Sequence, residues 1–196
     1  MTSVKTVLVP LDGSVHATAA IPVARGFGEL LHIPIALLHV SDDALTPPAL
    51  VDRMKLSDEE LPGLILEHRP GATAAAIVKV AGERHAAMIV MCPQIRTDLR
   101  WRALGSVAAA VLRAAPCPVV FVPPARGRKR WAALHRLLVS HDGTPTGAAT
   151  TGPATDLALK AAAELVVLHV AMPGTDAPTE PGTLASPRYV DQPQHE

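Results

Sequence analysis

The chain contains the stretch Val7-Leu8-Val9-Pro10-Leu11-Asp12-Gly13-Ser14, in which a nearly continuous apolar run ends at an Asp-Gly pair. A run of this kind is typical of a strand buried on both faces of a parallel sheet, since half-exposed strands alternate polar and apolar residues. Asp and Gly are common turn residues. The stretch therefore predicts a buried first strand with a turn at its carboxyl end.

Strands and helices alternate from this stretch onward. Residues 14–32 carry apolar side chains at helical spacing, which predicts an amphipathic helix capped by Asp12 or Ser14. Further strands are expected at 34–40, 63–68, 87–91 and 119–122, and further helices at 49–55, 72–85 and 106–114. This alternation indicates an α/β fold, a five-stranded parallel sheet flanked by helices in a Rossmann-like arrangement.

Composition excludes several classes of protein. Eighteen Lys and Arg balance 18 Asp and Glu over 196 residues, whereas a general nucleic-acid binder needs a basic surface. No apolar run approaches the roughly 18–20 residues that span a bilayer, and the chain starts without a secretory signal pattern. Two cysteines, Cys92 and Cys117, make no disulfide framework. We therefore expect a cytoplasmic protein with neither nucleic-acid nor membrane partners.

An internal repeat reproduces the sequences of the first two expected strands. Residues 137–144 align with 7–14, and residues 165–170 align with 35–40, both at an offset of 130 positions. Two segments that share one offset indicate a duplication. We expect a complete domain at 1–123, a basic linker at 124–134, a partial second domain (strand, helix, strand) at 135–172, and a disordered Pro-rich tail at 173–196.

Several segments are expected to meet at one edge of the sheet. Ligands of parallel sheets bind at the carboxyl ends of the strands, where Pro10 and Asp12, Val40, and Met91 follow three of the expected strands. Gly105-Ser106-Val107 opens a helix whose free N–H groups suit an anion. The carboxylate of Asp12 suits ribose hydroxyls or a metal, although Asp-Gly is also an ordinary turn. The arrangement predicts a nucleotide pocket.

Residues 5–123 resemble the universal stress protein family. The resemblance is carried by the segments 7–14, 38–40, 88–91, 104–107 and 115–120. It implies a five-stranded parallel sheet, pairing of the last strand across a homodimer and, in many members, ATP binding through a loop written Gly-x2-Gly-x9-Gly-Ser/Thr. Residues 135–170 resemble only the family's opening, so the whole resembles a tandem member whose second domain is truncated.

The loop pattern of the family is only partly present. Gly105-Ser106 supplies its last pair at the right spacing, but Cys92, Ile95 and Asp98 stand where the family has glycine. Glycine lets the backbone reach positive φ and approach phosphates, which β-branched Ile95 tolerates poorly, and Pro93 lacks an N–H donor. Three arginines nearby are either charge partners for phosphate or solvated: Arg96, Arg100 and Arg102.

The resemblance implies a stress-response module that is not an enzyme and that binds ATP or AMP, with Mg²⁺ only if ATP is bound. The expected ligand-binding residues are Pro10, Asp12, Val40, Met91, Cys92, Ile95, Gly105, Ser106 and Val107. The alternative is a degenerate member that acts as a dimerisation or protein-interaction module through the edge strand at 119–122, which begins at Val119 and ends at Val122.

An enzyme related to adenine-nucleotide hydrolases has less support, because no catalytic base is visible; weak ATPase activity stays open. No two histidines show the spacing of metal ligands. His39 lies inside an apolar strand, so we expect it to bond to backbone rather than to a metal.

Overall fold

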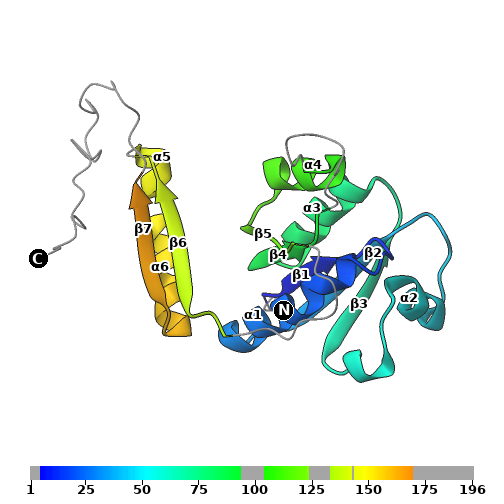
Figure 1. The fold of residues 1–196 in the computed structure, drawn as a ribbon. Coiled ribbons are helices and arrows are strands. Elements are labelled where there is room, and N and C mark those ends of the chain that lie inside the picture. Colours follow the sequence, from blue (N-terminus) through cyan, green and yellow to red (C-terminus); the bar gives the residue numbers. More distant parts are fainter. Residues whose placement is uncertain (1–4, 94–103, 124–132, 143, 170–196) are drawn as a thin grey trace, which may run out of the picture. The chain divides into compact units, whose positions relative to one another are not determined.

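The computed structural model describes residues 5–93, 104–123, 133–142 and 144–169. The chain divides into two compact units, residues 1–132 and 133–196, which Figure 1 shows as ribbons. Most of the expected linker, residues 124–132, and the whole expected tail at 173–196 lie outside the described residues.

The first unit is built on a five-stranded parallel sheet with the strand order β3-β2-β1-β4-β5. Its strands are β1 (Val7–Pro10), β2 (Ile35–Val40), β3 (Leu64–Arg69), β4 (Met88–Met91) and β5 (Val119–Phe121). Strand β1 lies between β2 and β4, and its Val7, Leu8 and Val9 are completely buried. The α/β class and the five-stranded parallel sheet, predicted from the alternation of strands and helices, are confirmed.

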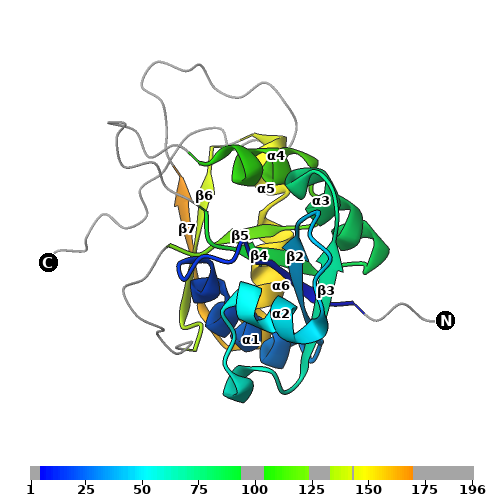
Figure 2. The ribbon, with the colours of Figure 1, turned by 90° about the vertical axis from the view of Figure 1, so that its right-hand side faces the viewer.

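Helices cover both faces of this sheet. They are α1 (Ala20–Leu31), α2 (Pro47–Met54), α3 (Thr73–Glu83) and α4 (Ser106–Ala114), with 3-10 turns η1 (Ala17–Ala19) and η2 (Asp58–Glu60). Figure 2 shows α1 and α2 on one side of the sheet and α3 and α4 on the other. Leu8, Leu38 and Ile89 of the sheet pack with Ile77 of α3 and Val111 of α4 in one buried cluster. Burial of each such side chain contributes roughly 1.5–3 kcal/mol.

The start of the first long helix differs from the prediction. Neither Asp12 nor Ser14 caps α1, whose N-cap is Ala19. Ser14 instead accepts a hydrogen bond on Oγ from the amide of Ala17 (3.2 Å), at the start of η1. Asp12 accepts one on Oδ1 from the amide of Ser14 (2.8 Å). The apolar spacing did not reveal this boundary, because a single 3-10 turn and an α-helix place side chains similarly over so short a segment.

The second unit contains two parallel strands, β6 (Arg136–His141) and β7 (Glu164–His169), connected through α5 (Pro145–Ala148) and α6 (Thr151–Ala161). Leu137 pairs with Leu165 in this unit, and Val7 pairs with Ile35 in the first, so the two registers agree at the offset of 130 positions. Among the described ranges, no helix of either unit is long and apolar enough to cross a membrane.

Candidate functional site

A cavity of about 330 Å³ opens at the carboxyl edge of the five-stranded sheet. The structure places eight of the nine expected site residues in its lining: Pro10, Asp12, Val40, Met91, Cys92, Gly105, Ser106 and Val107. The ninth, Ile95, lies outside the described residues, as do Arg96, Asp98, Arg100 and Arg102.

The sheet order brings these separated segments together. Strands β2, β1 and β4 are neighbours, so the residues that follow them lie side by side at one edge. The amide of Leu11 donates to the carbonyl of Leu38 (2.8 Å), which continues the pairing of β1 with β2 as far as the cavity. The adjacency of Asp12, Val40 and Met91 therefore follows from strand order.

Two helices begin at the cavity. The first ladder bond of α4 runs from the amide of Ala109 to the carbonyl of Gly105 (2.9 Å), so the amides of Ser106, Val107 and Ala108 precede the ladder and lack an intrahelical acceptor. Thr73, the first residue of α3, also lines the cavity. The free N–H groups and helix dipoles at these ends favour an anion.

The sequence prediction did not include Thr73, nor Ile77 one turn further along α3, although both line the cavity. A signal for Thr73 existed: a helix that follows a parallel strand begins at the carboxyl edge of the sheet, where ligands bind. Ile77 offered no separate signal, because its apolar side chain fits the core-facing pattern of α3 equally well.

The charges of the cavity are unequal. Asp12 is the one carboxylate among its described lining residues, and that part of the lining contains no Lys, Arg or His. Burial raises the pKa of the Cys92 thiol, and the negative charge of Asp12 raises it further. Cys92 is therefore an uncharged thiol near neutral pH. It is not an activated nucleophile, because the thiolate is the reactive form.

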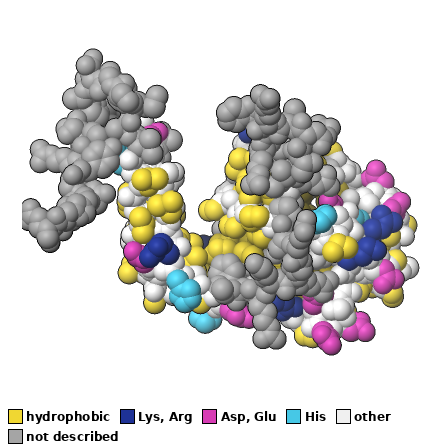
Figure 3. Space-filling model, viewed as in Figure 1, with side chains coloured by type: hydrophobic (Ala, Val, Ile, Leu, Met, Phe, Trp, Pro, Cys, Tyr) yellow, Lys and Arg dark blue, Asp and Glu magenta, His cyan; other side chains and the backbone are white. Residues whose placement is uncertain are grey.

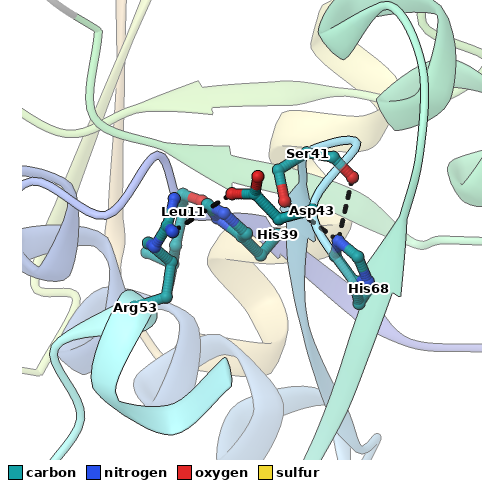
Figure 4. A network of polar contacts seen from close by, with 6 residues as sticks. All are labelled: Leu11, His39, Ser41, Asp43, Arg53 and His68. Carbon is teal, nitrogen blue, oxygen red and sulfur yellow. Dashed lines mark hydrogen bonds and ion pairs between the residues drawn. The ribbon is translucent and has the colours of Figure 1, made fainter. Parts of the chain in front are cut away.

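A polar network ties together the strand ends beside the cavity (Figure 4). The buried His39 donates from Nδ1 to the carbonyl of Leu11 (2.8 Å), as expected of a structural histidine. Nε2 of His68 lies 3.0 Å from the carbonyl of Ser41, and the two imidazole rings stack with their centroids 6.1 Å apart. Within the described ranges, no three His, Cys, Asp or Glu side chains gather as a metal site.

One family model and several solved structures are similar to this chain, and they concern the same family. The model of the Universal stress protein family matches residues 56–123. A universal stress protein from Archaeoglobus fulgidus DSM 4304 is similar at 20% identity and a TM-score of 0.63, over 90% of this chain and 70% of that chain.

Two further solved structures are similar. A putative universal stress protein from Pseudomonas aeruginosa UCBPP-PA14 is 20% identical, with a TM-score of 0.60, over 84% of this chain and 61% of that chain. A universal stress protein solved in complex with cAMP is 23% identical, with a TM-score of 0.48, over 63% of this chain and 100% of that chain. No curated protein matches the sequence.

The match to the family model begins after α2 and ends just after β5, so it covers three of the five strands and both helices that open at the cavity. The strands outside the match, β1 and β2, complete the same parallel sheet. Residues 56–123 of the first unit thus match the model of the Universal stress protein family, and the fold of this unit is that of solved universal stress protein structures.

Proposed function

We propose that the first unit binds an adenine nucleotide, AMP or ATP, in the cavity at the carboxyl edge of its sheet, and acts as a binding module rather than an enzyme. The observation that carries this proposal is the cavity itself. One space is lined by a carboxylate, by an apolar surface and by helix N-termini, contributed by segments almost a hundred residues apart in sequence. These are the three kinds of group that sugar, base and phosphate require.

Each part of the nucleotide has a suitable group. The carboxylate of Asp12 can accept hydrogen bonds from ribose hydroxyls, since an ionised carboxylate is a pure acceptor. Val40, Met91 and Ile77 offer apolar surface to the flat base. The amides of Ser106 and Val107 open α4 and suit a phosphate, because helix N-termini combine free donors with a favourable dipole.

Size and charge favour the monophosphate. The volume of about 330 Å³ is near the lower end of the roughly 300–1,000 Å³ typical of small-molecule sites. Each helix N-terminus supplies only about half a positive charge, and the described lining adds no cationic side chain. We therefore expect AMP to bind more tightly than ATP. If ATP binds, Mg²⁺ would be held mainly by phosphate oxygens, and Asp12 is the one carboxylate of the described lining.

Two measurements test the proposal. Mass spectrometry of the purified protein is expected to reveal a co-purifying adenine nucleotide, and calorimetry is expected to give saturable heat with AMP and weaker binding with ATP and Mg²⁺. Absence of both heat and a thermal shift at millimolar AMP and ATP would contradict it. Steady phosphate release from ATP that disappears in Asp12→Ala would instead indicate an enzyme.

Alkylation of Cys92 locates the ligand. In a Cys117→Ser background, iodoacetamide is expected to modify Cys92 slowly at pH 7 and faster at alkaline pH, because its raised pKa keeps the thiol protonated. Asp12→Asn is expected to speed the reaction at a given pH, since it removes the charge that raises this pKa. Saturating AMP is expected to protect Cys92 from iodoacetamide. Equal rates with and without bound AMP would place the ligand elsewhere.

A second candidate function, homodimerisation, is favoured by the open edge of the sheet. Strand β5 is an edge strand whose residues are half-buried, and Leu112 and Val107 of α4 are exposed. Unpaired edge strands readily pair with another chain. We propose that a second copy pairs along β5. Val120→Lys is then expected to halve the mass measured in solution, and an unchanged mass would remove this interface.

A further inference from the structure

We propose that Arg53, which lies outside the cavity lining, is a positioning residue for the nucleotide: it links the turn after β1 to the segment after β2 and so fixes Asp12. This inference rests on the proposed function, because it assigns Arg53 a role in ligand affinity. It uses the polar network that lies beside the cavity (Figure 4).

The first contact of Arg53 is with the turn that contains Asp12. Gly13 adopts a φ of +86°, and a Cβ atom there would lie 2.9 Å from the carbonyl oxygen of Arg53 and 3.4 Å from its Cδ. Gly13 is thus required twice, by its left-handed backbone and by this close approach. The end of α2 therefore packs directly against the residue that follows Asp12.

The second contact of Arg53 is with the segment that follows β2. Its guanidinium donates to Oδ2 of Asp43 at 3.1 Å, three residues beyond Val40 of the cavity lining. The neighbouring Asp42 accepts on Oδ1 from the amide of Gly71 (2.8 Å), which joins the same segment to the end of β3. Arg53 therefore approaches both segments that border the Asp12 side of the cavity, the turn with its carbonyl oxygen and side-chain stem and the segment after β2 with its guanidinium.

Helix α2 is itself held in place, so Arg53 can restrict the movement of the turn that contains Asp12 and Gly13. Leu50 and Met54, on the same helix, are buried, and the C-cap residue Lys55, which follows the helix, has the left-handed conformation. On the other side of Asp12, the carbonyl of Leu11 is held by His39. Asp12 thus lies between one backbone position held by β2 and another packed against α2.

The expected effect on affinity is modest. The Arg53–Asp43 pair is exposed, so its loss should weaken AMP binding by about two- to fivefold, the range that exposed ion pairs support. Arg53→Ala keeps the carbonyl oxygen that approaches Gly13 most closely but removes the side-chain stem beside it as well as the ion pair, so it should have a larger effect than Asp43→Asn. Arg53→Lys keeps the stem and a positive charge and should restore most of the affinity.

The experiment combines calorimetry with AMP and hydrogen exchange of the ligand-free protein. Arg53→Ala is expected to weaken AMP binding and to speed exchange of the Gly13 and Ser14 amides, while β2 amides and the melting temperature stay close to wild type. The matched control is Arg136→Ala, which removes another exposed arginine–carboxylate pair, that with Glu164 in the second unit, and should change neither reading for the first unit.

The outcomes separate the two proposals. If wild type does not bind AMP or ATP, the proposed function fails and the role of Arg53 in affinity fails with it. If wild type binds AMP and Arg53→Ala binds it equally well, only the positioning role is overturned. Unchanged exchange at Gly13 and Ser14, or a general loss of protection throughout the first unit, would also overturn it.

Discussion

The segments β1–α1–β2 and β6–α6–β7 have the same local geometry. Both strand pairs have the same register at the offset of 130 positions. Both helices end in the left-handed conformation, at His32 and at Ala162. His169 donates from Nδ1 to the carbonyl of His141 (3.0 Å), as His39 does to Leu11. We propose on this basis that residues 135–172 include a partial second copy of the first domain.

The two segments differ in burial. Leu8 is 0% exposed, whereas Leu138, its counterpart in the second unit, is 64% exposed; Leu38 is 0% exposed and its counterpart Leu168 is 46% exposed. Figure 3 shows hydrophobic side chains over β6 and β7. In the first unit this face of the sheet packs on α3 and α4. Local signals therefore set strand register and helix ends, whereas burial requires the later helices and strands.

The difference also bears on function. The second unit repeats the turn of Asp12, since the amide of Thr144 donates to Oδ1 of Asp142 at 3.0 Å. The described part of that unit contains no counterpart of α4, whose N-terminus opens at the cavity of the first unit. It thus provides the carboxylate of the turn without a counterpart of that helix N-terminus.

The largest expected effect is a difference in the free energy of unfolding between substitutions of Leu8 and of its counterpart Leu138. Leu8→Ala should lower the free energy of unfolding of the first unit by roughly 2–5 kcal/mol, because it leaves a cavity in a packed core. Leu138→Ala should change stability by less than about 0.5 kcal/mol, as surface substitutions do. Urea denaturation followed by circular dichroism measures both. A cost for Leu138→Ala equal to that of Leu8→Ala would show that its face is covered in solution.

Substitutions of the two equivalent histidines, His39 and His169, should differ less in their cost to stability. His39→Ala should cost roughly 1–3 kcal/mol, because it leaves the buried carbonyl of Leu11 without its donor. His169→Ala should cost under about 1 kcal/mol, because the same bond there is only partly buried. The same denaturation experiment compares them, and equal costs would contradict the assignment of the difference to burial.

The smallest expected effect is shared by the two units. His32 and Ala162 hold positive φ angles of 54° and 49°, a conformation that glycine adopts without steric cost. His32→Gly and Ala162→Gly should each raise stability by about 0.5 kcal/mol, since relief of strain exceeds the added chain entropy. Thermal melts would detect both gains. A loss at either site would show that the two helix ends are not equivalent.

The sequence was sufficient for the α/β class and for the side of the sheet on which a site would lie. Apolar runs and turn residues indicate local structure. The rule that ligands bind at the carboxyl ends of parallel strands then predicts the edge of the sheet at which a site would lie. The start of α1 was wrong because Ser14 and Asp12 bond within a tight turn instead of capping the helix. The place of the N-terminus of α3 in the cavity lining was not predicted, although the same rule applies to it.

The contact between Arg53 and Gly13 could not be predicted from the sequence. The two residues lie forty positions apart, and the approach of α2 to the turn depends on packing of Leu50 and Met54 rather than on any periodic pattern. The exposure of Leu138 was equally hidden, because its apolar neighbours in β6 are those of a buried strand. Tertiary packing decides both.

The most direct measurement is calorimetric titration of AMP into wild type, Asp12→Ala and Asp142→Ala. The two aspartates make the same turn bond, but only Asp12 lines the described cavity. We expect wild type and Asp142→Ala to bind AMP equally, and Asp12→Ala to lose at least about tenfold in affinity, the scale of a hydrogen bond to a charged group. Equal binding by Asp12→Ala, or none by wild type, would contradict the nucleotide site.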